Sequence, residues 1–492
     1  MKYWIFLSLA MLIFCGVVFA DAKLPETPAG VRAGEVLNLL NKGDKDLATE
    51  YIEKNYSPGF KESFPMTMHL GIFTTTNSMF GELEIYDIIN SSKNEINLLL
   101  KSVSRDAFIK LYISVEVEQP NLIASMGLTP AQRPEGYKSD DQKSKTEQKG
   151  VEKNTKPIDP ASINWKNIDN ILSQKTDSNE FSGTVLIAKD GQPLFQNGYG
   201  YSSKEFKAKN NIDTKFNIGS INKLFTSIGI IQLLEQGKVS IDDPIGKYLD
   251  YFPREIADKI TIRQLLQMRA GWGDYWGNEY FVTHRYDLRK LSEYMEFIKD
   301  IPLDFEPGTN FQHCNTCFEV LGAIIESVTG MDYYDYIHQN IYVPAGMTNT
   351  GSFHRDSVID NIATGYTNMN QEDTQGKDYN WTNRYLLSVR GTPAGGGYST
   401  VGDFLKFDQA FRNYKLLNKD YTHFIMSQYE GMSGDEFIPP NRMSMAMGGA
   451  PGIGAFYGRD LTNGFTILVF SNYDFTVVME TSNEIKKEMG LE

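Results

Sequence analysis

The chain has 492 residues, of which 41% are hydrophobic and 22% are charged, a composition typical of a soluble globular protein. A chain of this length is longer than the usual single domain with one hydrophobic core, so about two or three domains are expected. The formal net charge of −14 repels nucleic acid phosphates and anionic membranes, and no basic stripe offsets it. Nucleic acid is therefore not expected as a partner.

The N-terminal segment, residues 1–20, has the features of a secretory signal peptide. One early lysine is followed by an apolar run from Tyr3 to Phe19, and Ala20 precedes Asp21. This pattern predicts cleavage after residue 20 and an exported mature protein, periplasmic or secreted. An uncleaved membrane anchor is the alternative, and no later segment is apolar for long enough to span a bilayer.

Residues 29–130 are predicted to form a small accessory α+β domain. Two segments have helical patterns, Glu35–Leu40 and Leu47–Ile52. Three later segments have strand patterns: Leu83–Ile89, Glu95–Leu100 and Ala107–Val115. No constellation of catalytic residue types stands out in this region.

Hydrophobic residues nearly vanish over residues 131–160, where Lys, Glu, Asp, Gln and Ser dominate. Such a segment cannot bury enough apolar surface to offset the entropy lost on ordering. It is predicted to be a flexible linker. A second domain is then expected over residues 161–492.

The second domain is predicted to contain one antiparallel sheet completed by both of its ends. Two pairs of strand-like segments are expected to form hairpins: Phe181–Ala188 with Pro193–Asn197, and Gly454–Tyr457 with Phe465–Phe470. Helical patterns lie between and after them: Thr261–Gln267, Phe318–Val328 and Val477–Met489. Strands at both ends with helices between favour a sheet flanked by helices.

Ser220 and Lys223 stand three residues apart where an apolar, helix-patterned run begins, and Gly237 is a plausible end for that helix. Side chains at i and i+3 of a helix share a face, so the amine can lie beside the hydroxyl. A lysine partly withdrawn from water loses affinity for its proton and can activate a serine nucleophile. Alone the pair is weak evidence, because a helix cap and a solvated lysine give the same spacing.

Five further motifs follow the Ser-x-x-Lys pair in order: Gly237–Leu249, Ile260–Gln267, Phe305–Phe311, Val320–Gly330 and Pro393–Thr400. Together they resemble the serine β-lactamase-related family, which includes class C β-lactamases, DD-peptidases and esterases, over about residues 163–472. The resemblance implies a β-lactamase/transpeptidase-like α/β (α+β) fold with a helical subdomain. It also implies a small-molecule or peptide acyl substrate and no cofactor.

By position, the resemblance makes Ser220 the acyl-enzyme nucleophile and Lys223 the residue that helps to deprotonate it. The matching oxyanion donors are the backbone amides of Ser220 and Gly449, with Gly448 beside them on the strand that lines the pocket. Ala446 and Met447 stand where family members carry Lys or His and then Thr, Ser or Gly.

His313 and Asn315 stand where the family has Tyr-x-Asn. Alternate residues of an extended segment face one side, so both are expected to enter the pocket, with Asn315 contacting lysine and substrate. An ordinary pKa of about 6.5 suits His313 for proton transfer at neutral pH. A histidine that only fills space, or an inactive site, is the alternative.

The altered strand motif bears on the substrate. The family's basic side chain there helps to hold a substrate carboxylate, and neither Ala446 nor Met447 can do so. An esterase-like hydrolase of esters or other uncharged acyl groups is therefore predicted, ahead of a β-lactamase or DD-peptidase. The alternative outside the enzymes is a binding or scaffold protein that keeps the fold but does not turn over a substrate.

Cys314 and Cys317 form a Cys-x-x-Cys beside His313. In an exported chain they are expected to form a local disulfide or to stay as two buried thiols. A redox or metal function is the alternative, although zinc would need a fourth ligand that no nearby Cys or His supplies. The aromatic segment Trp272–Trp276 either lines a pocket rim or fills the core.

Overall fold

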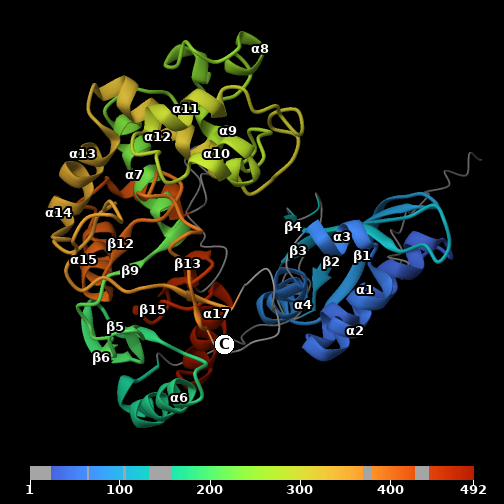
Figure 1. Ribbon diagram of the computed structural model, residues 1–492, viewed down its shortest axis with the longest axis horizontal. Helices are drawn as coiled ribbons and strands as arrows, with labels where there is room; N and C mark the ends of the chain where they lie inside the picture. The colour runs from blue at the N-terminus through green and yellow to red at the C-terminus, as the bar shows by residue number, and fades with distance from the viewer. Residues whose placement is uncertain are drawn as a thin grey trace, which may run out of the picture. The chain divides into compact units, whose positions relative to one another are not determined.

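The structure is a computed structural model that describes residues 24–63, 66–103, 107–131, 134, 158–368, 379–426 and 443–491. The chain divides into two compact units between Val151 and Glu152 (Figure 1). The predicted signal peptide, residues 1–20, and most of the predicted linker, residues 131–160, lie outside the described residues. No helix in the described ranges is long and apolar enough to cross a membrane.

The first unit packs helices against a four-stranded antiparallel sheet in the order β1-β2-β3-β4. Its strands are β1 (Leu83–Ser91), β2 (Glu95–Ser102), β3 (Phe108–Val115) and β4 (Ile123–Ala131). Its helices are α1 (Pro28–Lys42), α2 (Lys45–Asn55), α3 (Pro58–Ser63) and α4 (Met66–Phe80). Thr27 caps α1, and Gly43 ends it in the left-handed conformation that favours glycine. Buried apolar residues of α1 pack with those of β2 and β3, which makes one core.

The second unit is organised around a five-stranded antiparallel sheet in the order β13-β14-β15-β5-β6. Its strands are β5 (Gly183–Lys189), β6 (Gln192–Tyr199), β13 (Met443–Ala450), β14 (Ile453–Asp460) and β15 (Phe465–Ser471). Strand β15 pairs with β5 from Phe465 opposite Lys189 to Ser471 opposite Gly183. The prediction of one antiparallel sheet completed by both ends of the domain is confirmed.

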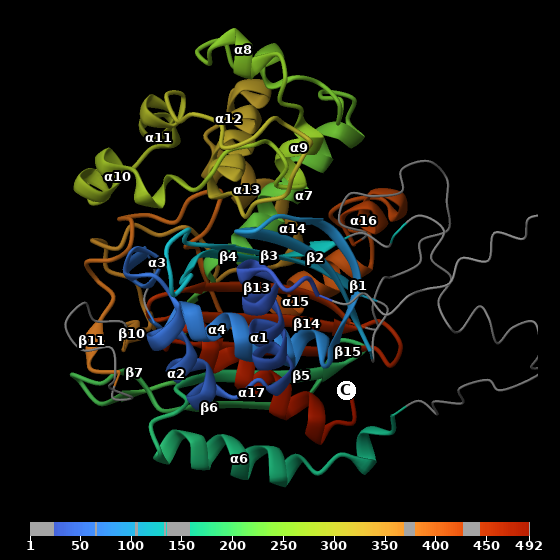
Figure 2. The ribbon, with the colours of Figure 1, turned by 90° about the vertical axis from the view of Figure 1, so that its right-hand side faces the viewer.

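This sheet is covered on both faces, because neighbouring residues of a strand point to opposite sides. Val185 and Ile187 pack with α6 (Trp165–Asp177) and α17 (Phe475–Glu488). Leu186 and Ala188 belong instead to the larger core that includes α7, α12 and α15. Figures 1 and 2 show α6 and α17 beside the sheet, with the helical region beyond its other face.

Helix α7 (Asn222–Glu235) crosses the larger core and is buried along most of its length. A helix that is apolar all round is stable only when it is enclosed, and α12, α13 and α16 contact it. It ends before Gly237, whose φ of +67° favours glycine, so the predicted end is confirmed.

The remaining elements of the second unit make up the helical region and the connections around the sheet. The longer helices are α10 (Glu279–His284), α11 (Leu291–Ile298), α12 (Asn315–Thr329), α15 (Val401–Arg412) and α16 (Lys419–Met426). The short ones are α8 (Arg254–Ala257), α9 (Ile262–Leu266), α13 (Tyr333–Ile337) and α14 (Val343–Ala345). Single turns are η1 (Pro160–Ser162), η2 (Gly219–Ile221), η3 (Ile245–Lys247), η4 (Tyr275–Gly277) and η5 (His338–Tyr342). Short strands are β7 (Tyr201–Ser203), β8 (Ala208–Lys209), β9 (Phe216–Asn217), β10 (Tyr366–Thr367), β11 (Trp381–Thr382) and β12 (Tyr398–Ser399).

Candidate active site

Ser220 lies in the 3-10 turn η2, immediately before α7. Gly219 precedes it with a φ of +50°, a conformation that favours glycine, and its amide donates to the Asn217 side chain at 2.9 Å. The turn therefore holds Ser220 at the N-terminal end of a long buried helix. Backbone amides and the helix dipole there favour a developing negative charge.

Lys223 lies one turn along and faces Ser220, as the spacing predicts. Its Nζ is 3.2 Å from Ser220 Oγ, and it donates to Asn315 Oδ1 at 2.5 Å and to the Ala394 carbonyl oxygen at 2.6 Å. The residue is only 6% exposed. These contacts place the amine beside the predicted nucleophile. The hydrogen bonds to Asn315 and Ala394 fix the orientation of the amine.

The environment of Lys223 favours its neutral form. Burial lowers the pKa of Lys223 to about 8, and the negative charges of Asp274 and Glu319 oppose that lowering. A useful fraction of the amine is therefore unprotonated near neutral pH. In that state it can accept a proton from Ser220.

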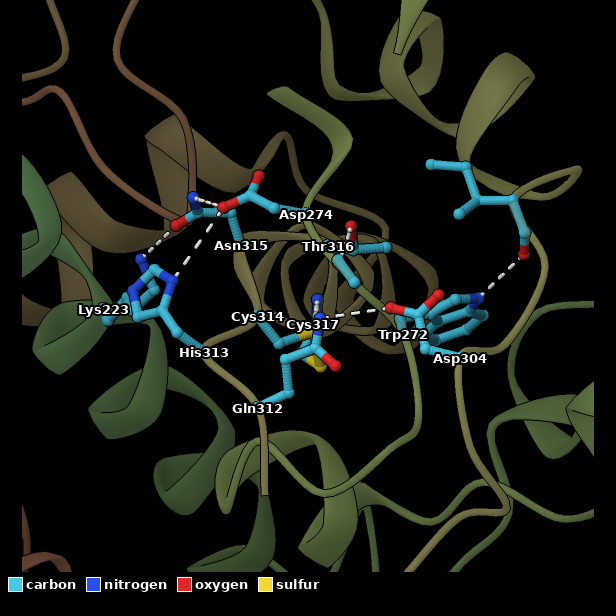
Figure 3. The surroundings of a disulfide bond; sticks show 12 residues. Lys223, Trp272, Asp274, Asp304, Gln312, His313, Cys314, Asn315, Thr316 and Cys317 are labelled. Carbon is cyan, nitrogen blue, oxygen red and sulfur yellow. Dashed lines mark hydrogen bonds and ion pairs between the residues drawn. A yellow bond between two sulfur atoms is a disulfide. The ribbon is translucent and has the colours of Figure 1, made fainter. Parts of the chain in front are cut away.

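Asn315 and His313 meet at Asp274 (Figure 3). Asn315 Nδ2 donates to Asp274 Oδ2, and His313 Nδ1 lies 3.9 Å from the same oxygen. The extended segment expected here stops at Cys314, because Asn315 is the first residue of α12. Asn315 therefore connects Lys223 with a carboxylate that the sequence analysis did not single out.

His313 itself makes no described hydrogen bond to the nucleophile. Its side chain is 56% exposed, and among the described residues no hydrogen bond joins its ring to Ser220 or Lys223. Partial burial, together with the charge of Lys223, lowers the pKa of His313 to about 4. The ring is then neutral at neutral pH and a weaker base than its ordinary pKa suggested.

Strand β13 is an edge strand, and its glycines contact the turn that carries Ser220. A Cβ atom on Gly448 would lie 2.0 Å from the Ile218 carbonyl oxygen and 2.7 Å from the Ser220 nitrogen. A Cβ atom on Gly219 would lie 2.8 Å from the Gly449 nitrogen. Only glycine permits so close an approach of the two backbones.

The backbone amide of Gly449 faces the turn that carries Ser220. The hairpin closes on the pair Ala450 and Ile453, and hydrogen-bonded pairs alternate along an antiparallel ladder. Gly449, one residue earlier, therefore directs its amide away from β14 and toward the free edge of the sheet. The amides of Ser220 and Gly449 lie close together, an arrangement able to stabilise an oxyanion.

A cleft with about 510 Å³ of empty space, partly open to solvent, contains Ser220. Asn315 and Gly449 line it, with Tyr275 and Trp276 as aromatic walls. Both interpretations of the aromatic segment hold, because Tyr275 is also buried in the core. His313 is not among the lining residues.

Two acidic residues of this region escaped the sequence analysis. Asp274 lies inside the aromatic segment and bonds Asn315. Glu319, on α12, is fully buried and accepts a hydrogen bond from the Tyr275 hydroxyl at 2.9 Å. Burial raises the pKa of Glu319 to about 7. A charged residue within the apolar run of α12 was the available signal, since buried acids are rare unless paired.

Cys314 and Cys317 are joined by a disulfide, one of the two states expected for them. Both are fully buried, and Cys314 Sγ also caps the start of α12. In the described ranges, no group of three or more His, Cys, Asp or Glu is placed to hold a metal ion. Because the disulfide joins the residues on either side of Asn315 and Thr316, it fixes the start of α12, where Asn315 lies.

Replacing both cysteines with alanine is expected to lower the free energy of unfolding by about 2 kcal/mol, the entropic contribution of a loop this short. Chemical denaturation of the wild type and of the Cys314→Ala, Cys317→Ala double variant measures the difference. Adding a reductant should destabilise only the wild type. Equal midpoints for wild type and variant would contradict the expectation.

The family follows from sequence comparison. A family model described as Beta-lactamase matches residues 168–487. The chain belongs to the β-lactamase family. This match confirms the resemblance seen in the motifs. Because the family consists of serine hydrolases, membership supports a hydrolase.

Relatives of this family share the fold. The chain is 29% identical over 264 residues to Penicillin-binding protein 4* of Bacillus subtilis, covering 52% of this chain and 57% of that relative. A penicillin binding protein from Bacillus halodurans matches with a TM-score of 0.56 and 27% identity, over 65% of this chain and 99% of that one. The hydrolase EstCE1 matches with a TM-score of 0.55 and 20% identity, over 66% and 97%. The chain thus spans little more than half of the first relative and nearly all of the two solved chains.

Proposed function

We propose that this protein is an exported serine hydrolase that cleaves an ester or amide through an acyl-enzyme on Ser220, with esters preferred over β-lactams. The observation that carries the proposal is the 3.2 Å contact between the buried Lys223 Nζ and Ser220 Oγ, where Ser220 lines a partly open cleft. Export is supported by the apolar pattern of residues 1–20 and by the disulfide, a bond typical of oxidising compartments.

The proposed reaction begins with proton transfer. Neutral Lys223 takes the Ser220 proton as the oxygen attacks the substrate carbonyl carbon. The carbonyl electron pair moves to its oxygen, and the amides of Ser220 and Gly449 hold the resulting oxyanion. As the oxyanion collapses, the leaving group departs and takes a proton from Lys223. Water then hydrolyses the acyl-enzyme by the same steps.

The preference for esters rests on β13. Ala446 is half-buried on this strand and offers no cation to a substrate carboxylate held in the manner of β-lactam-binding relatives. EstCE1, which shares the fold, is described as a hydrolase with promiscuous acyltransferase activity. A binding protein without turnover is the rival, and it does not require the lowered pKa of Lys223.

Three probes of the purified protein test the proposal: a fluorophosphonate, a short-chain aryl ester and a chromogenic cephalosporin. We expect covalent labelling of the peptide that contains Ser220, turnover of the ester and little turnover of the cephalosporin. Absence of both labelling and turnover would contradict a hydrolase. Faster turnover of the cephalosporin than of the ester would contradict the esterase preference.

The pH dependence of ester turnover should report Lys223. Because the neutral amine is the active form, kcat/KM is expected to rise with pH and level off above about 8. Glu319→Gln removes a charge that raises the pKa of Lys223, so this variant should level off at lower pH. Rate profiles between about pH 5 and 10 measure both. A single inflection near pH 4 in each protein would instead indicate His313.

A further inference from the structure

Asp274 ends a chain of polar contacts that starts at the nucleophile. Lys223 Nζ lies 3.2 Å from Ser220 Oγ and donates to Asn315 Oδ1 at 2.5 Å. Asn315 Nδ2 in turn donates to Asp274 Oδ2, so the amide lies between the amine and the acid (Figure 3). The proton transfer proposed above gives Asp274 no role, although only one side chain separates this carboxylate from the amine.

Two donors hold the Asp274 carboxylate. Oδ2 accepts from Asn315 Nδ2, and Oδ1 accepts from the Trp276 backbone amide at 3.1 Å, because Asp274 caps the turn η4. Both oxygens therefore act as acceptors, which an ionised carboxylate can do and a side-chain amide cannot. Burial raises the pKa of Asp274, and these two donors and the charge of Lys223 oppose that change.

The carboxylate determines which end of the Asn315 amide meets Lys223. A side-chain amide has one accepting oxygen and one donating nitrogen. Because an ionised Asp274 only accepts, it selects the orientation that turns Nδ2 toward the acid and Oδ1 toward the amine. The reverse orientation would point an N–H of Asn315 at Lys223 and set a carbonyl oxygen against the carboxylate.

This orientation of Asn315 leaves the lone pair of neutral Lys223 for Ser220. A neutral amine has two N–H groups and one lone pair. The oxygens of Asn315 and Ala394 accept the two N–H groups, and Ser220 Oγ is the third described polar contact of Nζ. An amide turned the other way would donate to the lone pair and so compete with the serine proton.

The charge of Asp274 also acts on the amine. Burial lowers the pKa of Lys223, and among the charges that oppose this change that of Asp274 is the largest, ahead of that of the buried Glu319. His313 is the other titratable side chain here, with Nδ1 3.9 Å from Asp274 Oδ2, and its lowered pKa keeps it neutral. Asp274 therefore favours the ammonium form that Lys223 takes when it receives the serine proton.

We propose that Asp274 is a positioning residue that, through Asn315, directs the lone pair of Lys223 at Ser220 and stabilises the ammonium formed by proton transfer. In that step the Ser220 O–H bond breaks while a third N–H bond forms on Lys223, and the serine oxygen bonds to the substrate carbonyl carbon. The inference rests on the proposed hydrolase function. Asp274 acts only through its neighbours, because it is not among the residues that line the cleft.

Asp274→Asn tests the orientation with a side chain of nearly the same size. Asparagine keeps an oxygen for the Trp276 amide, and its NH2 group then faces Asn315, which favours the reversed amide. We expect kcat for an aryl ester to fall by about hundredfold, with KM kept within about twofold, as for a lost contribution to proton transfer. The profile of kcat/KM should level off at lower pH than in the wild type, because a charge that raises the pKa of Lys223 is removed.

Two further variants separate orientation from folding. Asp274→Ala removes the carboxylate without presenting a donor to Asn315, so its loss in kcat should be smaller than that of Asp274→Asn. Asp304→Asn is the matched control, because Asp304 is exposed, accepts from Gln312 Nε2 at 3.1 Å and is not among the charges that act on Lys223. It should leave the rate and the pH profile unchanged. If Asp274→Ala unfolds, Asp274→Asn decides the matter, since asparagine caps a turn as well as aspartate does.

The titration of Lys223 provides a measurement that does not require turnover. In protein isotope-labelled at the lysine Cε atoms, the NMR signal of Lys223 is assigned by its absence from Lys223→Met and should titrate at lower pH in Asp274→Asn than in the wild type. An unchanged titration, a kcat within about twofold of the wild type, or a larger loss in Asp274→Ala than in Asp274→Asn would overturn the role of Asp274. The hydrolase would still stand, because Ser220 would still be labelled and the ester turned over by the wild type. Conversely, a wild type without turnover whose Lys223 titration shifts in Asp274→Asn would contradict the hydrolase alone.

Discussion

Ser220→Ala is expected to lower kcat/KM for an aryl ester by about 10⁴-fold or more and to abolish fluorophosphonate labelling. The alanine variant lacks the oxygen that Lys223 contacts at 3.2 Å, so no acyl-enzyme can form. The residual rate would come from the amides of Ser220 and Gly449, which the substitution leaves in place. Steady-state kinetics and gel fluorescence measure the two losses.

The Ser220→Ala variant should keep its fold, since Lys223 retains its hydrogen bonds to Asn315 and to the Ala394 carbonyl oxygen. Ser327→Ala is a matched control, because Ser327 is exposed on α12 and donates only to the Tyr248 carbonyl oxygen. It should be turned over and labelled like the wild type. Turnover above about 1% in Ser220→Ala, at an unchanged melting temperature, would contradict the role of Ser220.

The local chemistry of turns made much of the second unit's sheet predictable. The hairpins at Asp190-Gly191 and at Asn463-Gly464 both turn on glycines with positive φ, +82° for Gly191 and +78° for Gly464. By contrast, α4 was not predicted, because Thr74–Thr76 gives its middle a run of poor helix formers. Packing against α1 and α2 stabilises that helix, and such contacts are invisible in the sequence.

The candidate site also contains one part that the sequence predicts and one part that depends on tertiary structure. The spacing of Ser220 and Lys223 encodes their contact directly, because both belong to one helical segment. Asp274 and Asn315, by contrast, lie on separate segments of the chain that tertiary structure brings into hydrogen-bond contact. No spacing rule links such positions, so their roles could be read only from the structure.

Lys223→Met tests which group moves the proton. Met keeps most of the length and apolar surface of the lysine but cannot accept a proton. We expect kcat/KM for the neutral ester to fall by about 10³-fold, within the range for a lost general base, and the inflection near pH 8 to disappear. Kinetics across pH, with circular dichroism to verify the fold, measure both effects.

His313→Gln provides the comparison, because His313 stands at the position of the family tyrosine. Its exposed ring, with a pKa of about 4 and no hydrogen bond to Ser220 or Lys223, is poorly suited to accept the serine proton. We therefore expect a loss below about tenfold, well short of general-base removal. Equal losses in the two variants would mean that His313 shares the proton transfer in the substrate complex. A small loss beside a large one assigns the proton to Lys223, with Asn315 and the Ala394 carbonyl oxygen directing its amine.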